Sequence, residues 1–292
     1  MKHIINLRTV TVFFTVMIVA MLASPCHAQF SLYDNFLDGF IDPAKWQGIS
    51  TEGSIIRPAA EVLRTAEEGS FHAKLVAWGD DASNSGSFVT RQGLNITQLG
   101  TYGTSGYING LKAKVTVVGT DVQDCPTNPE ASAPALGQAQ LIAAFFNDGT
   151  SPAAGDTTGD ILGIIELRKN RNGTNTVFAS VNRIPVDGSP GSNPIAVPGN
   201  PVTFNTTWSI DSPLVLQMQW NQVGGKIKFV VTGAQTTETV NITYTGTVAE
   251  AGPPISDFKS VRLRNTAENC LGDRKRTMMD ALFDNINVKR VP

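Results

Sequence analysis

Helical periodicity, histidine, cysteine and charge are all scarce in this chain of 292 residues. Charged residues make up 16% of it, and it has three histidines and three cysteines against 27 glycines and 16 prolines. Low charge combined with many turn formers is typical of exported β proteins rather than of helical ones. Beyond residue 28 the only histidine is His72, which a catalytic triad or a lyase base would have to use, and no Gly-x-Ser-x-Gly elbow is present.

The first 28 residues have the pattern of a secretory signal peptide. Lys2 and Arg8 flank the start of an apolar run over 10–22, and small residues follow up to Ala28. The run is short for a membrane span, and no later stretch is long and apolar enough for one. We therefore expect residues 29–292 to form one exported domain, extracellular or periplasmic, that does not insert into a membrane.

The balance of charge after the leader is slightly acidic. Residues 29–292 carry 21 Lys and Arg against 25 Asp and Glu, a net charge of −4. This balance argues against nucleic acid or an anionic membrane as the partner.

Two cysteines, Cys125 and Cys270, follow the leader, each in a loop-like stretch. In an oxidising compartment a disulfide is the default pairing. It would close a loop of about 145 residues and contribute roughly 4–5 kcal/mol in the chain-entropy model. Two isolated cysteines without a nearby histidine suit a metal much less well.

Alternation of apolar and polar residues runs through most of the chain. It predicts strands over 71–78, 86–92, 111–119, 139–147, 159–169, 176–184, 213–220, 226–233, 238–246, 259–265 and 282–289. The clearest hairpin joins 213–220 to 226–233, and the turn-rich loop 120–138 leaves room for a short helix. About a dozen strands in an uninterrupted chain predict an all-β, two-sheet antiparallel sandwich.

The closing strand raises a question, because alternation places Asp284 on the same side as Leu282, Ile286 and Val288. A carboxylate on a buried side needs a matching charge or hydrogen bonds. Its wording, Phe-Asp-Asn at 283–285, is repeated as Tyr-Asp-Asn at 33–35. The two fragments could mark a catalytic site, a metal site or the seam of a fold.

Three segments resemble the concanavalin A-like lectin/glucanase superfamily and its laminin G-like relatives. They are DNFLDGFIDPAKW (34–46), LQMQWNQVGGKIKFVVTG (216–233) and MDALFDNINV (279–288). The resemblance implies a jelly-roll sandwich whose first and last strands pair side by side. It implies no single activity, because this architecture hosts lectins, glycosidases, lyases and adhesion modules.

The resemblance also implies a use for Asp284. In the glucanase branch an aspartate in a closing strand of this kind often helps to hold a structural calcium ion, and Asp38 and Gly39 are then the neighbouring candidate ligands. Two metal-free interpretations are favoured over calcium: Asp284 accepts backbone N–H bonds from the turn at 36–40, or a bulge aims it outward. Each of these roles is architectural.

The glucanase relatives carry a Glu-x-Asp-x-x-Glu run that this sequence lacks. Asp160 and Glu166 are the nearest approach, but six residues of strand separate them by roughly 20 Å. Glycosidase carboxyl groups lie within about 10 Å of each other. The lyase relatives use Arg, Gln or His, and Tyr in a concave sheet, and their fuller strand motifs are also missing.

Glu166 and Arg168 share one face of their strand and could hydrogen-bond a glycan beside an aromatic platform. The simpler interpretation is an ion pair in solvent, which contributes little. Trp78 ends a strand at a polar turn and is the tryptophan expected to be partly exposed, whereas Trp46 and Trp220 are expected in the core.

The sequence thus predicts a secreted, non-catalytic binding or structural β-sandwich, with carbohydrate as the leading ligand class. One alternative is a divergent glycoside hydrolase or polysaccharide lyase whose residues converge from separate strands. Another is a surface or matrix component that acts through protein contacts. Calcium is the only cofactor predicted, and the oligomeric state is left open.

Overall fold

The structure is a computed structural model, and it describes nine stretches of the chain. These are residues 29–51, 60–67, 69–102, 104–128, 134–146, 160–184, 193–221, 225–244 and 257–292. The leader predicted at 1–28 lies outside them, so the division into leader and one domain stays a prediction. None of the described residues is helical, including those at 120–128 and 134–138, where a short helix was considered.

One sheet, which we call the β16 sheet, has the strand order β14-β13-β12-β6-β16-β4-β3. Strand β4 accompanies the first half of β16, and β1 pairs with its second half. Its strands are β1 (Phe30–Asp34), β3 (Ala60–Glu67), β4 (Ser70–Trp78), β6 (Ile108–Val122), β12 (Leu214–Asn221), β13 (Lys226–Thr232), β14 (Thr237–Thr243) and β16 (Arg276–Arg290).

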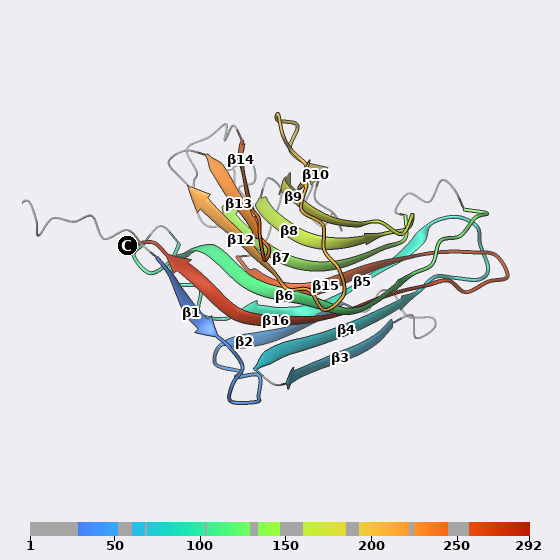
Figure 1. Ribbon diagram of the computed structural model, residues 1–292, viewed down its shortest axis with the longest axis horizontal. Helices are drawn as coiled ribbons and strands as arrows, with labels where there is room; N and C mark the ends of the chain where they lie inside the picture. Colours follow the sequence, from blue (N-terminus) through green and yellow to red (C-terminus); the bar gives the residue numbers. More distant parts are fainter. Residues whose placement is uncertain are drawn as a thin grey trace, which may run out of the picture.

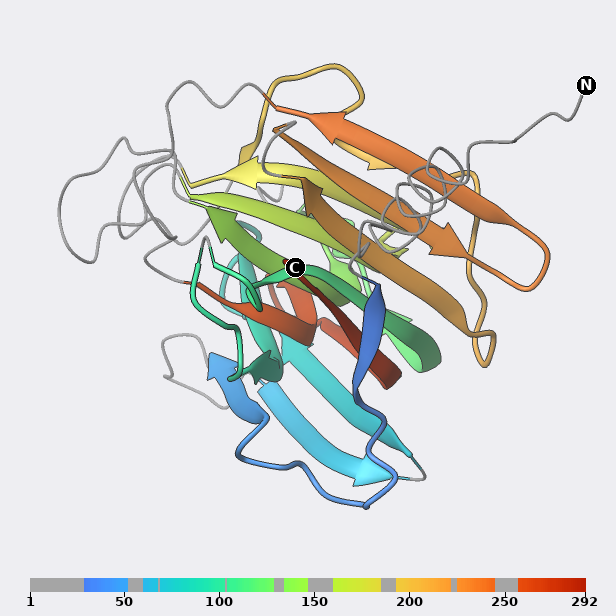
Figure 2. The ribbon, with the colours of Figure 1, turned by 90° about the vertical axis from the view of Figure 1, so that its left-hand side faces the viewer.

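The other sheet, the β8 sheet, has the order β10-β9-β8-β7-β15-β5-β2, and β11 also pairs with β9. Its strands are β2 (Trp46–Thr51), β5 (Ser87–Ile96), β7 (Leu136–Phe146), β8 (Ile161–Asn170), β9 (Asn175–Arg183), β10 (Asn193–Pro194), β11 (Val202–Thr203) and β15 (Lys259–Glu268). The two sheets stack as layers of one sandwich (Figures 1 and 2). The predicted all-β, two-sheet antiparallel jelly-roll sandwich is confirmed.

Each of the eleven strands predicted from alternation falls on an observed strand, and β1, β2, β3, β10 and β11 are additions. The pairing of β1 with β16 confirms that the first and last strands lie side by side (Figure 1). Alternation could not predict β1 because its five residues do not alternate cleanly between buried and exposed.

The core lies between the sheets and is filled by the inward-facing residues of both. In the predicted hairpin, Met218 pairs with Phe229 and Trp220 with Ile227, and all four are at most 3% exposed. Each such side chain contributes roughly 1.5–3 kcal/mol by leaving water. Trp46 is likewise 3% exposed, so the expected core position of Trp46 and Trp220 is confirmed.

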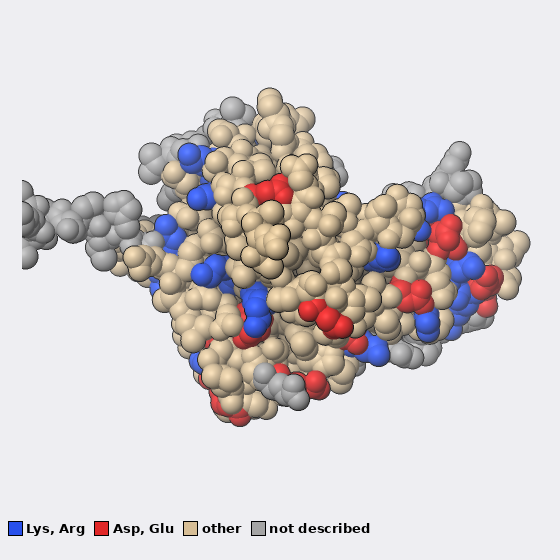
Figure 3. Space-filling model, viewed as in Figure 1, with Lys and Arg blue, Asp and Glu red and all other residues tan. Residues whose placement is uncertain are grey.

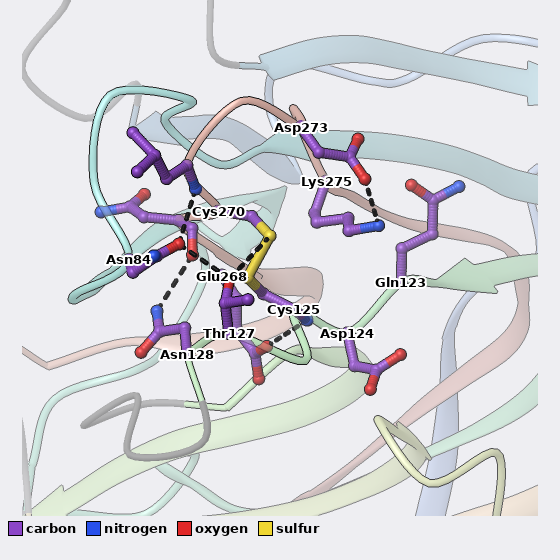
Figure 4. The surroundings of a disulfide bond; sticks show 12 residues. Asn84, Gln123, Asp124, Cys125, Thr127, Asn128, Glu268, Cys270, Asp273 and Lys275 are labelled. Carbon is purple, nitrogen blue, oxygen red and sulfur yellow. Dashed lines mark hydrogen bonds and ion pairs between the residues drawn. A yellow bond between two sulfur atoms is a disulfide. The ribbon is translucent and has the colours of Figure 1, made fainter.

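A disulfide closes one end of the sandwich, where the loops after β4, β6 and β15 meet (Figure 4). Cys125 and Cys270 are bonded with their Cα atoms 5.5 Å apart, which confirms the predicted pairing. Beside it, the fully buried carboxylate of Glu268 accepts backbone N–H bonds from Cys125 at 2.7 Å and Ala135 at 2.8 Å. On the face seen in Figure 3, acidic and basic side chains gather at this end, including the ion pair between Lys275 and Asp273.

Candidate functional site

Strand β16 changes its inward-facing parity at Asn285. Before it, Phe283 is buried in the core while Asp284 points to the outer face. Asn285 takes a positive φ of 49° and the register with β6 shifts between Asp284 and Asn287, which is a β-bulge. The extra residue returns Ile286 and Val288 to the core. The expectation that Asp284 shares the side of Ile286 and Val288 is therefore wrong, and the alternative of an outward-aiming bulge is confirmed.

The partners of Asp284 are a lysine and an amide. Its Oδ2 forms an ion pair with Lys114 Nζ on β6 and accepts a hydrogen bond from Asn285 Nδ2 at 2.9 Å. Asp38 instead lies in an exposed turn, with Oδ1 3.5 Å from the amide nitrogen of Phe40. Among the described residues no group of three or more His, Cys, Asp or Glu side chains could hold a metal. A calcium ion at Asp284 would have to displace Lys114, so the site does not fit the ion as it stands.

The role considered for Asp284 at the 36–40 turn belongs to Asp34, in the matching fragment. Asp34 is 5% exposed; its Oδ1 accepts the Phe36 backbone N–H at 3.0 Å and its Oδ2 accepts Trp46 Nε1–H at 2.7 Å. It lies opposite Ile286, so the two similar fragments meet at the seam between the first and last strands. The calcium ligands Asp284, Asp38 and Gly39 stay a prediction, and the contacts made by Asp34 are architectural.

A second group of polar residues lies on the outer face of the β8 sheet, and we call it the β8 cluster. It occupies strand positions that alternate with core residues such as Leu141, Leu167 and Leu263. Its members are Arg91 from β5, Gln138 and Gln140 from β7, Glu166 and Arg168 from β8, Phe178 from β9, and Arg262 and Arg264 from β15.

The strand register brings the cluster together in two rows across the sheet. In one row Arg91 is opposite Arg264, Arg264 is opposite Gln138, and Gln138 is opposite Arg168. The second row runs through Arg262, Gln140, Glu166 and Phe178. Side chains directly opposite one another on a sheet face are in contact range. The cluster is thus a consequence of pairing between β5, β15, β7, β8 and β9.

Glu166 is the hub of the cluster. Its Oε2 accepts hydrogen bonds from Gln138 Nε2 at 2.8 Å and from Gln140 Nε2, and its Oε1 accepts one from Arg168 Nε. The side-chain oxygens of the two glutamines in turn accept from two further arginines. Gln140 Oε1 accepts Arg262 Nε–H at 2.8 Å, and Gln138 Oε1 accepts one from Arg264 at 2.8 Å.

The interpretation of Glu166 and Arg168 as an ion pair in solvent is wrong. Glu166 is 1% exposed, and the Arg168 guanidinium lies over the Phe178 ring, 3.2 Å from its centroid. The sequence of β8 alone could not reveal this, because the groups that enclose the pair come from β7, β9 and β15. A signal was nonetheless present: three strands each carry two polar residues two positions apart, as Gln-x-Gln, Glu-x-Arg and Arg-x-Arg.

The electrostatics of the cluster are unbalanced. Burial lowers the pKa of Arg262 to about 9, Arg91 and Arg264 lower it further, and Glu166 acts against them. Burial also lowers the pKa of Arg264, where Glu166 opposes the shift and Arg168 and Arg91 add to it. Four guanidinium groups therefore interact around one carboxylate.

Trp78 does not join this cluster. It lies at the end of β4, on the outer face of the β16 sheet, because the alternate residues Phe71, Ala73 and Leu75 face the core. It is partly buried, with the guanidinium of Arg274 5.7 Å from its ring centroid. The aromatic ring beside Glu166 and Arg168 is Phe178, which sequence reasoning missed.

The other titratable residues of note lie elsewhere. His72, on the outer face of the β16 sheet, contacts Glu67 through Nδ1 at 2.9 Å and Asp280 through Nε2 at 2.7 Å, as expected of a hydrogen-bonded histidine. Lys259 was missed although it opens β15 at an inward-facing position. Its fully buried Nζ donates to Tyr107 Oη at 2.8 Å, and burial lowers its pKa to about 8.

No family model matches the sequence, and no curated protein sequence matches it significantly. Similar solved structures are concanavalin A-like lectins and glucanase-related proteins, as the resemblance implied. The metal-free Emp46p carbohydrate recognition domain is 12% identical with a TM-score of 0.42, covering 88% of this chain and 98% of that one. A Clostridium perfringens endo-β-galactosidase that releases GlcNAcα1-4Gal is 11% identical with a TM-score of 0.40, covering 91% and 63%.

A third similar structure is Rv0315, an immunostimulatory antigen and pseudo β-1,3-glucanase of Mycobacterium tuberculosis. It is 15% identical with a TM-score of 0.36, and the match covers 90% of this chain and 98% of that chain. Similarity at this level transfers neither a ligand nor an activity. Separately, no helix among the described residues is long and apolar enough to cross a membrane.

Proposed function

We propose that the protein is an exported, non-catalytic glycan-binding β-sandwich, and that the outer face of the β8 sheet is its binding face. The β8 cluster is the observation that supports this proposal. Glycan sites combine directional polar groups with an aromatic or apolar surface, and the cluster offers amide, carboxylate and guanidinium groups beside a phenyl ring.

The cluster has a buried floor and a more accessible rim. Glu166, Gln138 and Gln140 are each at most 2% exposed and are held by mutual hydrogen bonds. Arg91 is exposed, and the Arg168 side chain keeps 24% of its exposure. A floor with fixed rotamers under an accessible rim lowers the entropy cost of ordering side chains on binding.

The placement of carboxylates favours binding over glycoside hydrolysis as the function of this face. Hydrolysis of a glycosidic bond uses two carboxyl groups across the scissile bond. The outward-facing residues of β8 are Leu162, Ile164, Glu166 and Arg168, and the single carboxylate among them already accepts three hydrogen bonds. A glycoside hydrolase or lyase is the alternative that the following experiment also tests.

Thermal unfolding with a panel of neutral and acidic polysaccharides tests the proposal, together with an assay for released products. A ligand that binds only the folded protein raises the unfolding midpoint by mass action. We expect at least one polysaccharide to raise the midpoint without product release, and Phe178→Ala to abolish the rise. Trp78→Ala, on the opposite face, is the control and should leave it unchanged.

Three outcomes would overturn the proposal. A rise that depends on Trp78 instead of Phe178 would move the binding face to the β16 sheet. Product release would make the protein an enzyme. No rise with any polysaccharide would favour a structural component that acts through protein contacts.

A further inference from the structure

The further inference rests on the proposed function, because it concerns the ligand of the same face. We infer that the glycan bound by the β8 cluster is polyanionic, carrying carboxylate or sulfate groups along its chain. Three observations on the charges of the cluster point to this class of ligand.

The first observation is the excess of cations. The groups that act on one another in the cluster are the guanidiniums of Arg91, Arg168, Arg262 and Arg264 and the carboxylate of Glu166. The excess runs against the trend of the chain, since residues 29–292 hold more acidic than basic residues. Buried charges are stable when they are paired, so an anion is the partner this group lacks.

The second observation is a like-charge pair in register. Arg91 and Arg264 are direct cross-strand partners on β5 and β15 and point to the same face. Like charges directly opposite on a sheet are destabilising. A carboxylate or sulfate seated between the two guanidiniums would convert this repulsion into two charge-assisted contacts.

The third observation is the direction in which the arginines are held. The glutamine oxygens accept one hydrogen bond each, from Arg262 Nε at 2.8 Å and from Arg264 at 2.8 Å. A guanidinium has five N–H donors in a planar fork. The glutamines therefore fix the planes of these two arginines while using few of their donors, which suits bidentate recognition of carboxylate or sulfate.

A neutral glycan would not satisfy these groups equally well. Its hydroxyls can hydrogen-bond to guanidinium but carry no charge to offset the cation excess. A nucleic acid would supply anions, but the net charge of −4 over residues 29–292 makes a broad phosphate footprint unfavourable. A chain of acidic sugars places anions at regular spacing and can meet two rows of side chains.

Binding titrations on the exported protein with three probes test the inference: a polyuronate, a dextran sulfate and an uncharged dextran of matched length. We expect one or both anionic probes to bind at least tenfold more tightly than dextran, with an affinity that falls as salt is raised. The polyuronate and dextran sulfate arms show whether carboxylate or sulfate is preferred. Arg264→Gln and Arg91→Gln should each weaken anionic binding by about tenfold.

The matched control is Lys114→Gln, which removes the same charge from the outer face of the β16 sheet. It should leave anionic binding unchanged. Arg91 is exposed, so its variant tests the inference even if Arg264→Gln fails to fold. An equal loss in Lys114→Gln would mean non-specific charge attraction and would overturn the inference.

The outcomes separate this inference from the proposed function. If dextran binds the β8 face as tightly as both anionic probes, the ligand is neutral and the inference fails while the proposed function stands. If no polysaccharide binds at all, both fail.

Discussion

The outer face of the β16 sheet distributes its charges as local pairs, whereas the outer face of the β8 sheet gathers four guanidiniums around one carboxylate. On the first face Lys114 pairs with Asp284, and both keep some exposure, 41% and 14% of their side chains. On the second face Glu166 is 1% exposed and bonded by residues of two strands. The comparison teaches that alternation places a residue on a face, while register and burial decide what that residue does there.

The energies of the two faces should differ for the same reason. Partly solvated ion pairs gain little because water screens them and because long side chains lose entropy when they are fixed. In a buried network each group depends on the others, so removing one leaves its partners desolvated and unmatched. The following variants test this difference, starting with the largest expected effect.

Glu166→Gln should destabilise the protein by on the order of 3–5 kcal/mol, because it leaves buried arginines without their carboxylate. The matched substitution on the other face, Asp284→Asn, should cost less than about 1 kcal/mol. Urea denaturation of both variants, followed by fluorescence, measures the two losses. Equal losses would remove the distinction between the faces.

How much of this could be predicted depends on which interactions are local in sequence. Period-2 alternation placed Met218 and Trp220 in the core, and two cysteines in an exported chain indicated their own pairing. Asp284 was assigned to the wrong side because alternation counts residues, and the bulge at Asn285 inserts one.

The β8 cluster could not be predicted as a unit, because it depends on the order of strands in the sheet. Glu166 and its neighbours Gln138 and Arg264 are distant in sequence, and they meet only through the pairings of β7 with β8 and with β15. Trp78 was grouped with Glu166 for the same reason, although strand order places it on the opposite face. The repeated polar-x-polar pattern marked the strands involved but not their adjacency.

Asn285→Val should cost about 1–2 kcal/mol, because a β-branched residue is strained at the positive φ of 49°. Asn285→Gly is the control, since it also loses the hydrogen bond to Asp284 but accepts this backbone conformation. Denaturant midpoints of the two variants give the comparison. If glycine costs as much as valine, the side-chain bond rather than the bulge conformation holds Asp284 on the outer face.

His72 should make the stability of the β16 face depend on pH. Burial lowers the pKa of His72, but its hydrogen bonds to Asp280 and Glu67 raise it more, so the folded pKa lies above the usual 6.5. The protonated ring therefore stabilises the fold fully below about pH 6.5, and this contribution is lost as pH rises through the folded pKa. Lys74, whose Nζ lies 3.9 Å from Asp280 Oδ2, is the opposing cation.

Unfolding midpoints of the protein and of His72→Gln between pH 5.5 and 8.5 measure this contribution. The difference between them should shrink as pH rises. Arg91→Gln, on the β8 face, should follow the unmodified protein across the same range. A difference that stays constant with pH would mean that His72 acts through packing alone.

The smallest effect expected is the coupling between Lys114 and Asp284. A double-mutant cycle with Lys114→Gln and Asp284→Asn should give about 0.2–1 kcal/mol, because the lysine side chain is 41% exposed and water screens the pair. The coupling should fall further in 1 M salt, where the screening length is about 3 Å. A larger coupling that resists salt would show that this pair behaves like the buried cluster, and burial would then no longer be what separates the two faces.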